Sequence, residues 1–191
     1  MDKDFEDMSW KEQYKLLWKE FLGDRNGADE LLKWMEEKGF FESPASTKYH
    51  GSYPGGLCQH SINVTFNALD LCGLPAFAGV DRHAAAVAAL LHDICKVGVY
   101  RRREDGRYEY FDDRGIGHGT GSVLLAKKYI TLTLEEQAAI RWHMGMYSDM
   151  EMAAELAAKL SGVYSLCPLA LLIHHADMMA TYCGGEEKQE K

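Results

Sequence analysis

The sequence has few cysteines and no arrangement of them that would build a framework. There are five in 191 residues, an odd number that is widely spaced and has no Cys-x-x-Cys pair. This pattern argues against a disulfide scaffold and against a zinc site made of thiolates. We therefore expect free, buried thiols in a reducing compartment at Cys58, Cys72, Cys95, Cys167 and Cys183.

Positive charge is also scarce. Lys and Arg number 21 against 29 Asp and Glu, which gives a formal net charge of −8. A long nucleic-acid duplex needs a basic surface to neutralise its phosphates, so we expect no such partner. A nucleotide or a short strand end needs only a local cluster of charge or a bound cation.

Long apolar runs are missing as well, because no segment is apolar for long enough to span a membrane. Residues 1–7 are acidic and lack the basic start and apolar middle of a signal peptide. The sequence therefore predicts a cytoplasmic protein without a membrane partner. It does not indicate an oligomeric state.

Helical periodicity dominates what is present. Capping boxes at Ser9/Glu12 and Thr133/Glu136 mark two helix starts. Apolar spacing and glycine or proline breaks predict helices over about 9–22, 28–38, 57–71, 81–96, 119–130, 134–144, 150–160 and 168–182. Two short arms between Val99 and Phe111 flank Asp105-Gly106, which favours a β-hairpin with a type I′ turn.

The expected fold is therefore all-α, a single-domain bundle of about eight helices with one small hairpin. We expect residues 1–48 to form N-terminal helices that pack on a core of residues 49–183. Residues 184–191 are expected to be a disordered tail.

A histidine and an aspartate stand side by side at His92 and Asp93, after the apolar run Ala-Ala-Val-Ala-Ala-Leu-Leu. Burying an imidazole and a carboxylate together costs free energy unless each has a strong partner. A divalent cation is one such partner, and a hydrogen-bonded pair that tightens the core is the alternative. Adjacent helical residues diverge by about 100°, so a shared metal would lie at the edge of the helix.

Four more donors lie on other predicted helices or just before one. Helical bundles commonly build metal sites from one side chain on each of several helices. Imidazole and carboxylate together favour Mn, Fe, Co, Ni or Zn over Ca. The donors are His60, His118, His143 and Asp177.

The order His…His-Asp…His…His…Asp resembles the HD-domain superfamily of metal-dependent phosphohydrolases. The resemblance covers residues 49–182, with Pro54-Gly55-Gly56-Leu57 before His60 and the Leu90–Lys96 stretch as its specific parts. These look most like the HD modules of bacterial 3′–5′ exoribonucleases and related nucleic-acid-processing proteins. The family usually has glycine where this chain has Cys95. We expect no oligonucleotide-binding domain of the kind that those exonucleases carry, which leaves the nucleic-acid substrate open.

The resemblance implies a role for each donor. His60, His92, Asp93 and Asp177 would hold a first divalent transition metal, with Asp93 also orienting the attacking water. His118 and His143 would hold a second metal or contact phosphate, so one or two ions are expected. Lys96 would be a catalytic residue that meets a substrate phosphate, although a solvated lysine at a helix end is its plain alternative.

Other candidates are weaker. His50 precedes the Pro-Gly-Gly stretch and is a candidate for substrate binding, with a surface histidine as the alternative. Arg101 on the hairpin is also a candidate for substrate binding, and the alternative is that it belongs to a solvated, charged hairpin. His174 lies close to Asp177 on one helix face and is a candidate partner for it.

The sequence thus predicts hydrolysis of a phosphomonoester or phosphodiester by metal-activated water. The expected substrate is small and phosphorylated, a nucleotide or a short single strand. Two alternatives stay open: a di-iron oxygenase of the same superfamily, and a non-catalytic module that binds a nucleotide.

Overall fold

A computed structural model describes residues 3–48, 50–111, 115–147 and 153–183 of the chain. The tail expected to be disordered, 184–191, lies outside these residues. So does the start expected for the helix over 150–160.

Helices dominate the described residues, which confirms the all-α expectation. Eight helices are longer than two turns, α1 has only four residues, and four short segments are 3-10 helices. The bounds are α1 Lys3–Glu6, α2 Trp10–Phe21, α3 Ala28–Glu37, η1 Phe40–Glu42, α4 Gly56–Leu71, η2 Pro75–Phe77, α5 Arg82–Leu91, η3 Ile94–Lys96, α6 His118–Ala126, α7 Leu134–Trp142, η4 Gly145–Tyr147, α8 Ala153–Leu166 and α9 Pro168–Tyr182.

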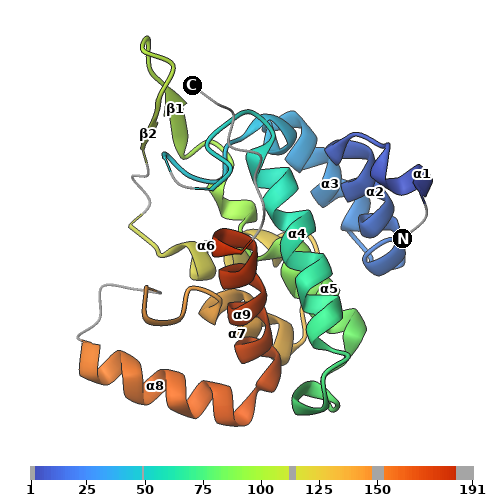
Figure 1. Ribbon diagram of the computed structural model, residues 1–191, viewed down its shortest axis with the longest axis vertical. Helices are drawn as coiled ribbons and strands as arrows, with labels where there is room; N and C mark the ends of the chain where they lie inside the picture. Colours follow the sequence, from blue (N-terminus) through green and yellow to red (C-terminus); the bar gives the residue numbers. More distant parts are fainter. Residues whose placement is uncertain (1–2, 49, 112–114, 148–152, 184–191) are drawn as a thin grey trace.

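The centre of the bundle is made by α4, α5, α7 and α9. Helix α4 packs against both α5 and α9, and α7 packs against α5 and α9. All eight residues of α5 from Ala84 to Leu91 are buried, and five of them are alanines. Small side chains let neighbouring helices approach closely, so α5 can run through the middle of the molecule (Figure 1).

The N-terminal helices cover one side of this centre (Figure 1). Helix α2 contacts α4 and α5. Its Tyr14 is fully buried, with its ring 4.9 Å from that of Phe40 and 6.0 Å from that of Trp18. Arg25 makes a paired ion contact with the buried Glu136 of α7. These contacts join the first 48 residues to the bundle, and the boundary drawn after residue 48 stays a prediction.

The hairpin forms where expected, but its turn differs. Strands β1 Tyr100–Arg102 and β2 Tyr108–Tyr110 pair antiparallel, with Arg102 opposite Tyr108. The expected type I′ turn is wrong, because it needs positive φ at both central residues. Gly106 has φ +80, but no described non-glycine residue has positive φ. Instead, Arg103 donates its N–H to the Arg107 carbonyl, so a three-residue loop of Glu104, Asp105 and Gly106 joins the strands, and Gly106 N–H donates to the Arg103 carbonyl within it.

The expected helix over 81–96 is also shorter. Helix α5 ends at Leu91, and a separate 3-10 turn follows from Ile94.

The five cysteines all lie in the described residues, and none forms a disulfide. Of these, Cys58, Cys95 and Cys167 are buried, Cys72 is half-buried, and Cys183 is exposed, contrary to expectation. No single described helix is long and apolar enough to cross a membrane, and the pair formed by 158–166 and α9 is bent by 110°.

Candidate metal centre

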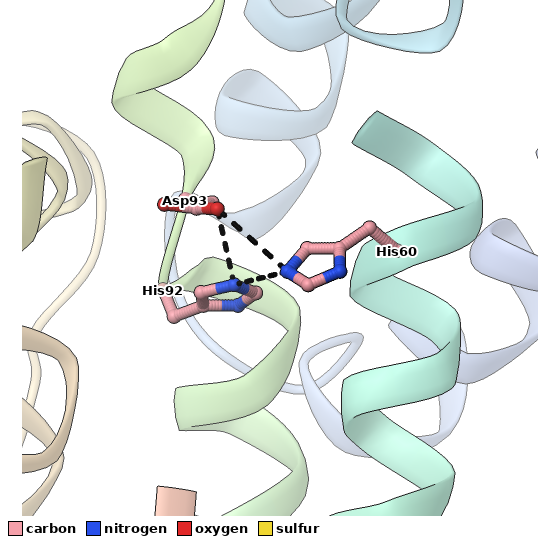
Figure 2. Close-up of side chains that lie close together, drawn as sticks. All are labelled: His60, His92 and Asp93. Carbon is pink, nitrogen blue, oxygen red and sulfur yellow. Dashed lines mark hydrogen bonds and ion pairs between the residues drawn. The ribbon is translucent and has the colours of Figure 1, made fainter. Parts of the chain in front are cut away.

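His92 and Asp93 lie at a bend rather than inside a helix. His92 caps the C-terminus of α5 with helical backbone angles, and Asp93 leaves the helix with φ −118 and ψ 12. The bend turns the carboxylate toward the imidazole, so that Asp93 Oδ2 lies 3.2 Å from His92 Nε2. The 100° divergence of adjacent helical residues is thereby removed, and both side chains point to one place (Figure 2).

His60 approaches the same place from α4. Its Nε2 lies 3.3 Å from His92 Nε2 and 3.9 Å from Asp93 Oδ2 (Figure 2). Asp177 of α9 adds Oδ1 at 3.0 Å from the same His60 nitrogen. All four residues are buried. Ligands about 2.1 Å from one metal and at right angles to each other lie about 3 Å apart, so these separations fit a shared cation.

Backbone carbonyls fix the orientation of two histidine rings, those of His92 and His143. The Nδ1 of His92 is 2.7 Å from the Ala89 carbonyl, and the Nδ1 of His143 is 2.8 Å from the Ile140 carbonyl. A carbonyl only accepts, so Nδ1 carries the proton and Nε2 keeps its lone pair. Metal-binding histidines are commonly fixed in this way.

Among the buried polar atoms without a hydrogen bond to any described residue are Asp93 Oδ1 and His143 Nε2, which lie 3.5 Å apart. Unpaired buried polar atoms are costly and call for a missing partner. A cation between them would bind the lone pair of His143 Nε2 and the Asp93 oxygen, so the residues present fit a metal ion. His60, His92 and Asp93 form a group whose ligand atoms all lie within 4.8 Å of one another.

The charges around the cluster support the same conclusion. Burial alone would raise the pKa of Asp93, but Lys96 and His92 hold it well below its ordinary value. Burial disfavours the charged form of both imidazoles and lowers the pKa of His60. For His92 the adjacent Asp93 outweighs burial and raises the pKa. The carboxylates therefore stay ionised and attract positive charge to this point.

A cavity of about 210 Å³ lies beside the cluster. Lys96 reaches it and is buried, with its Nζ 2.7 Å from Asp93 Oδ2. Burial would lower the pKa of Lys96, but Asp93 raises it above its ordinary value, so the ammonium stays charged. The lining is made of His50, Lys96, His143, Met144, Asp177, Met178, Thr181 and Tyr182.

His50 is half-buried, and its ring lies against that of His60. The loop carrying it folds tightly, since a Cβ on Gly56 would come 2.1 Å from the Gly51 carbonyl oxygen. The His50 ring lies 4.6 Å from that of His60, and both its ring nitrogens are buried without a hydrogen bond from the described residues. Burial, with the nearby His60 and Lys96, lowers the pKa of His50 to about 4.

Three predicted candidates lie elsewhere or make other contacts. His118 begins α6 and contacts Cys95 and Tyr110, so its part in metal binding stays a prediction. Arg101 is exposed on the hairpin, with its guanidinium 3.3 Å from the centre of the Phe111 ring. His174 donates from Nδ1 to the His143 carbonyl at 2.6 Å, rather than to Asp177.

Sequence reasoning missed part of the cavity wall. Met178, Thr181 and Tyr182 were not among the candidates, although all three line the cavity. They follow Asp177 by one, four and five residues on α9. Helical spacing places Thr181, four residues on, on the same face as Asp177, so that signal would have found Thr181. Met178 and Tyr182 lie off that face, and the spacing does not predict them.

Comparison with known proteins identifies a family and a relative. Residues 57–182 match the family described as HD domain. A curated relative from Methanocaldococcus jannaschii, named dihydroneopterin 2',3'-cyclic phosphate phosphodiesterase, is 41% identical over 85 residues. The aligned stretch covers 43% of this chain and only 34% of that relative. No solved structure matches the chain.

The family match spans most of the chain and contains His60, His92, Asp93, Lys96 and Asp177. The chain therefore belongs to the HD-domain family.

Proposed function

We propose that the chain hydrolyses a phosphodiester of a small, nucleotide-like substrate, with a divalent transition metal held by His60, His92, Asp93 and Asp177. The observation that carries this proposal is the convergence of two imidazole nitrogens and a carboxylate at one buried point. That point opens on a cavity lined by a charged lysine.

The metal would supply a nucleophilic water at neutral pH and a positive charge for the phosphoryl oxygens. Asp93 uses Oδ2 toward His60 and His92, and Oδ1 toward His143. A carboxylate with one oxygen on each side can serve two ions, with His143 on the second side. Whether one or two ions bind, and which element, is part of the proposal's test.

Lys96 binds and neutralises a phosphate oxygen in this scheme. Its ammonium is held at the cavity wall by Asp93 and is shielded from solvent. A buried charge acts more strongly on a phosphate than an exposed one. His50, neutral at physiological pH, has two ring nitrogens facing inward and offers a hydrogen bond to the same substrate.

The cavity favours a small substrate. Binding sites for drug-sized ligands usually measure about 300–1,000 Å³, and this cavity of about 210 Å³ is smaller. It suits a phosphate and an attached sugar or ring, with larger parts outside. A cyclic phosphate or the end of a short strand is such a substrate. The name of the relative from Methanocaldococcus jannaschii favours a cyclic phosphate, and the resemblance to exoribonuclease modules favours a strand end.

The test is elemental analysis of the purified protein, followed by assays with the metal found. The assays include nucleoside 2',3'-cyclic phosphates, dinucleotides, nucleoside monophosphates and bis(p-nitrophenyl) phosphate. We expect diester cleavage by the wild type and none by His92→Ala. His83→Ala is the matched control, because His83 is an exposed histidine on the same helix.

Two results would contradict the proposal. One is a metal-loaded wild-type protein that cleaves none of the diesters. The other is an iron-loaded protein that consumes oxygen and releases no phosphate ester product, which would favour the oxygenase alternative.

A further inference from the structure

The bend that carries His92 and Asp93 is held by side chains from two other helices. Helix α5 ends at Leu91, so the last carbonyls of α5 lack regular helical partners. The buried Tyr14 of α2 donates its hydroxyl to one of them, the Leu90 carbonyl, at 2.8 Å. This contact lies two residues before His92.

A second hydroxyl holds the other side of the bend. Cys95 would donate its N–H to a residue of α5 if the helix continued, but it donates to Ser122 Oγ at 3.3 Å. Ser122 is fully buried on α6. This contact lies two residues after Asp93. The two hydroxyls thus bracket the His92–Asp93 pair in the chain and come from different directions in the fold.

We propose that Tyr14 and Ser122 are positioning residues, which together hold the α5 bend so that His92 and Asp93 face the same metal. Without the bend, adjacent helical positions would diverge by about 100°. Tyr14 lies outside residues 57–182, which match the family. The N-terminal helices therefore contribute to the metal centre through a backbone carbonyl and do not only cover the core. The proposal rests on the proposed metal site.

Tyr14 suits this role because burial raises its pKa well above the ordinary value, so it remains a donor. Its ring is held by Phe40 and Phe41, at 4.9 Å and 5.7 Å between ring centres. Removing only the hydroxyl therefore leaves the packing in place. Tyr14→Phe is the sharpest variant, and Ser122→Ala is its counterpart on the far side of the bend.

The experiment is a titration of metal-stripped protein with Mn²⁺ and with Co²⁺. Binding is measured by calorimetry and, for Co²⁺, also by the visible absorption of the bound ion. We expect each variant to bind the metal about 10-fold more weakly, as for other residues that support metal ligands indirectly. The Co²⁺ spectrum should also change, because the ligand geometry does. Tyr129→Phe is the matched control, since Tyr129 packs against Trp34 away from the bend, and it should match wild type.

Unchanged affinity and an unchanged Co²⁺ spectrum in folded Tyr14→Phe and Ser122→Ala would overturn the proposal. If Tyr14→Phe does not fold, Ser122→Ala decides the matter on the same readings. A wild type that binds no metal would remove the proposed metal site and this inference together. A wild type that binds metal but cleaves no diester would count against the proposed function alone.

Discussion

The C-terminal ends of α5 and α7 have the same backbone geometry at a histidine but carry different residues after it. Both helices finish at a buried histidine with nearly the same backbone angles, φ −56 and ψ −34 at His92, and φ −58 and ψ −33 at His143. In both, the ring nitrogen Nδ1 points back to the carbonyl three residues earlier. Both rings thus offer Nε2 to the space between the helices, and their centres are 4.9 Å apart.

The residues after each histidine differ between the two helix ends. The α5 end continues with Asp93 and Lys96, so it brings its own carboxylate and its own cation. The α7 end continues with Met144 and Gly145, and His143 faces the carboxylate supplied by Asp93. The α5 end thus carries its own anion beside His60 and is where we propose the first metal, while the α7 end depends on α5 for its anionic partner.

Asp93→Asn should have the largest effect, because Asp93 serves both helix ends. We expect loss of stoichiometric metal and of turnover, with the helical content retained, since the amide keeps the shape of the side chain. Elemental analysis and circular dichroism measure the two quantities. Asp70→Asn on α4 is the control, because Asp70 is exposed. A variant that keeps its metal and its activity would show that the two ends do not share Asp93.

His143→Ala should have an intermediate effect. We expect turnover to fall by about 10²-fold, the scale of losing one group that stabilises charge in the transition state. One equivalent of metal should stay bound, because His60, His92 and Asp93 are intact. Steady-state kinetics and metal content are measured on the same sample. Equal loss of metal from His143→Ala and His92→Ala would show that the two helix ends form one site and do not differ in metal binding.

His174→Ala should have the smallest effect. The His174 ring donates to the His143 carbonyl and packs against Gly145, where a Cβ would come 2.6 Å from the ring. Removing it loosens the α7 end without touching a metal ligand. We expect kcat/KM to fall by up to about 10-fold. His175→Ala controls for it, since His175 is exposed next to it. A drop as large as that of His143→Ala would give His174 a direct part in the chemistry.

Much of the site could be predicted from the sequence because its residues break the polar-out pattern. His92, Asp93 and Asp177 follow apolar runs, and the free-energy cost of burying such groups indicates a partner. The family order then adds His60 and His143. The structure brings His60, His92, Asp93 and Asp177 together, and His143 beside Asp93, while metal ligation itself stays a prediction.

The bend after Leu91 could not be predicted, because no glycine or proline interrupts the sequence there before Gly98. In our proposal it is held by a hydrogen bond that Tyr14 donates to Leu90 and one that Ser122 accepts from Cys95, across 76 and 27 residues of sequence. Contacts of that range leave no local pattern. The prediction of the hairpin turn was wrong for a local reason. Asp105-Gly106 suits more than one turn type, and the number of loop residues decides between them.

The most direct test is anomalous X-ray scattering from a crystal of the protein purified with its own metal. We expect a peak within bonding distance of His60 Nε2, His92 Nε2 and Asp93 Oδ2, with Asp177 turned toward it. A well-ordered crystal with these four side chains resolved and no peak among them would contradict it.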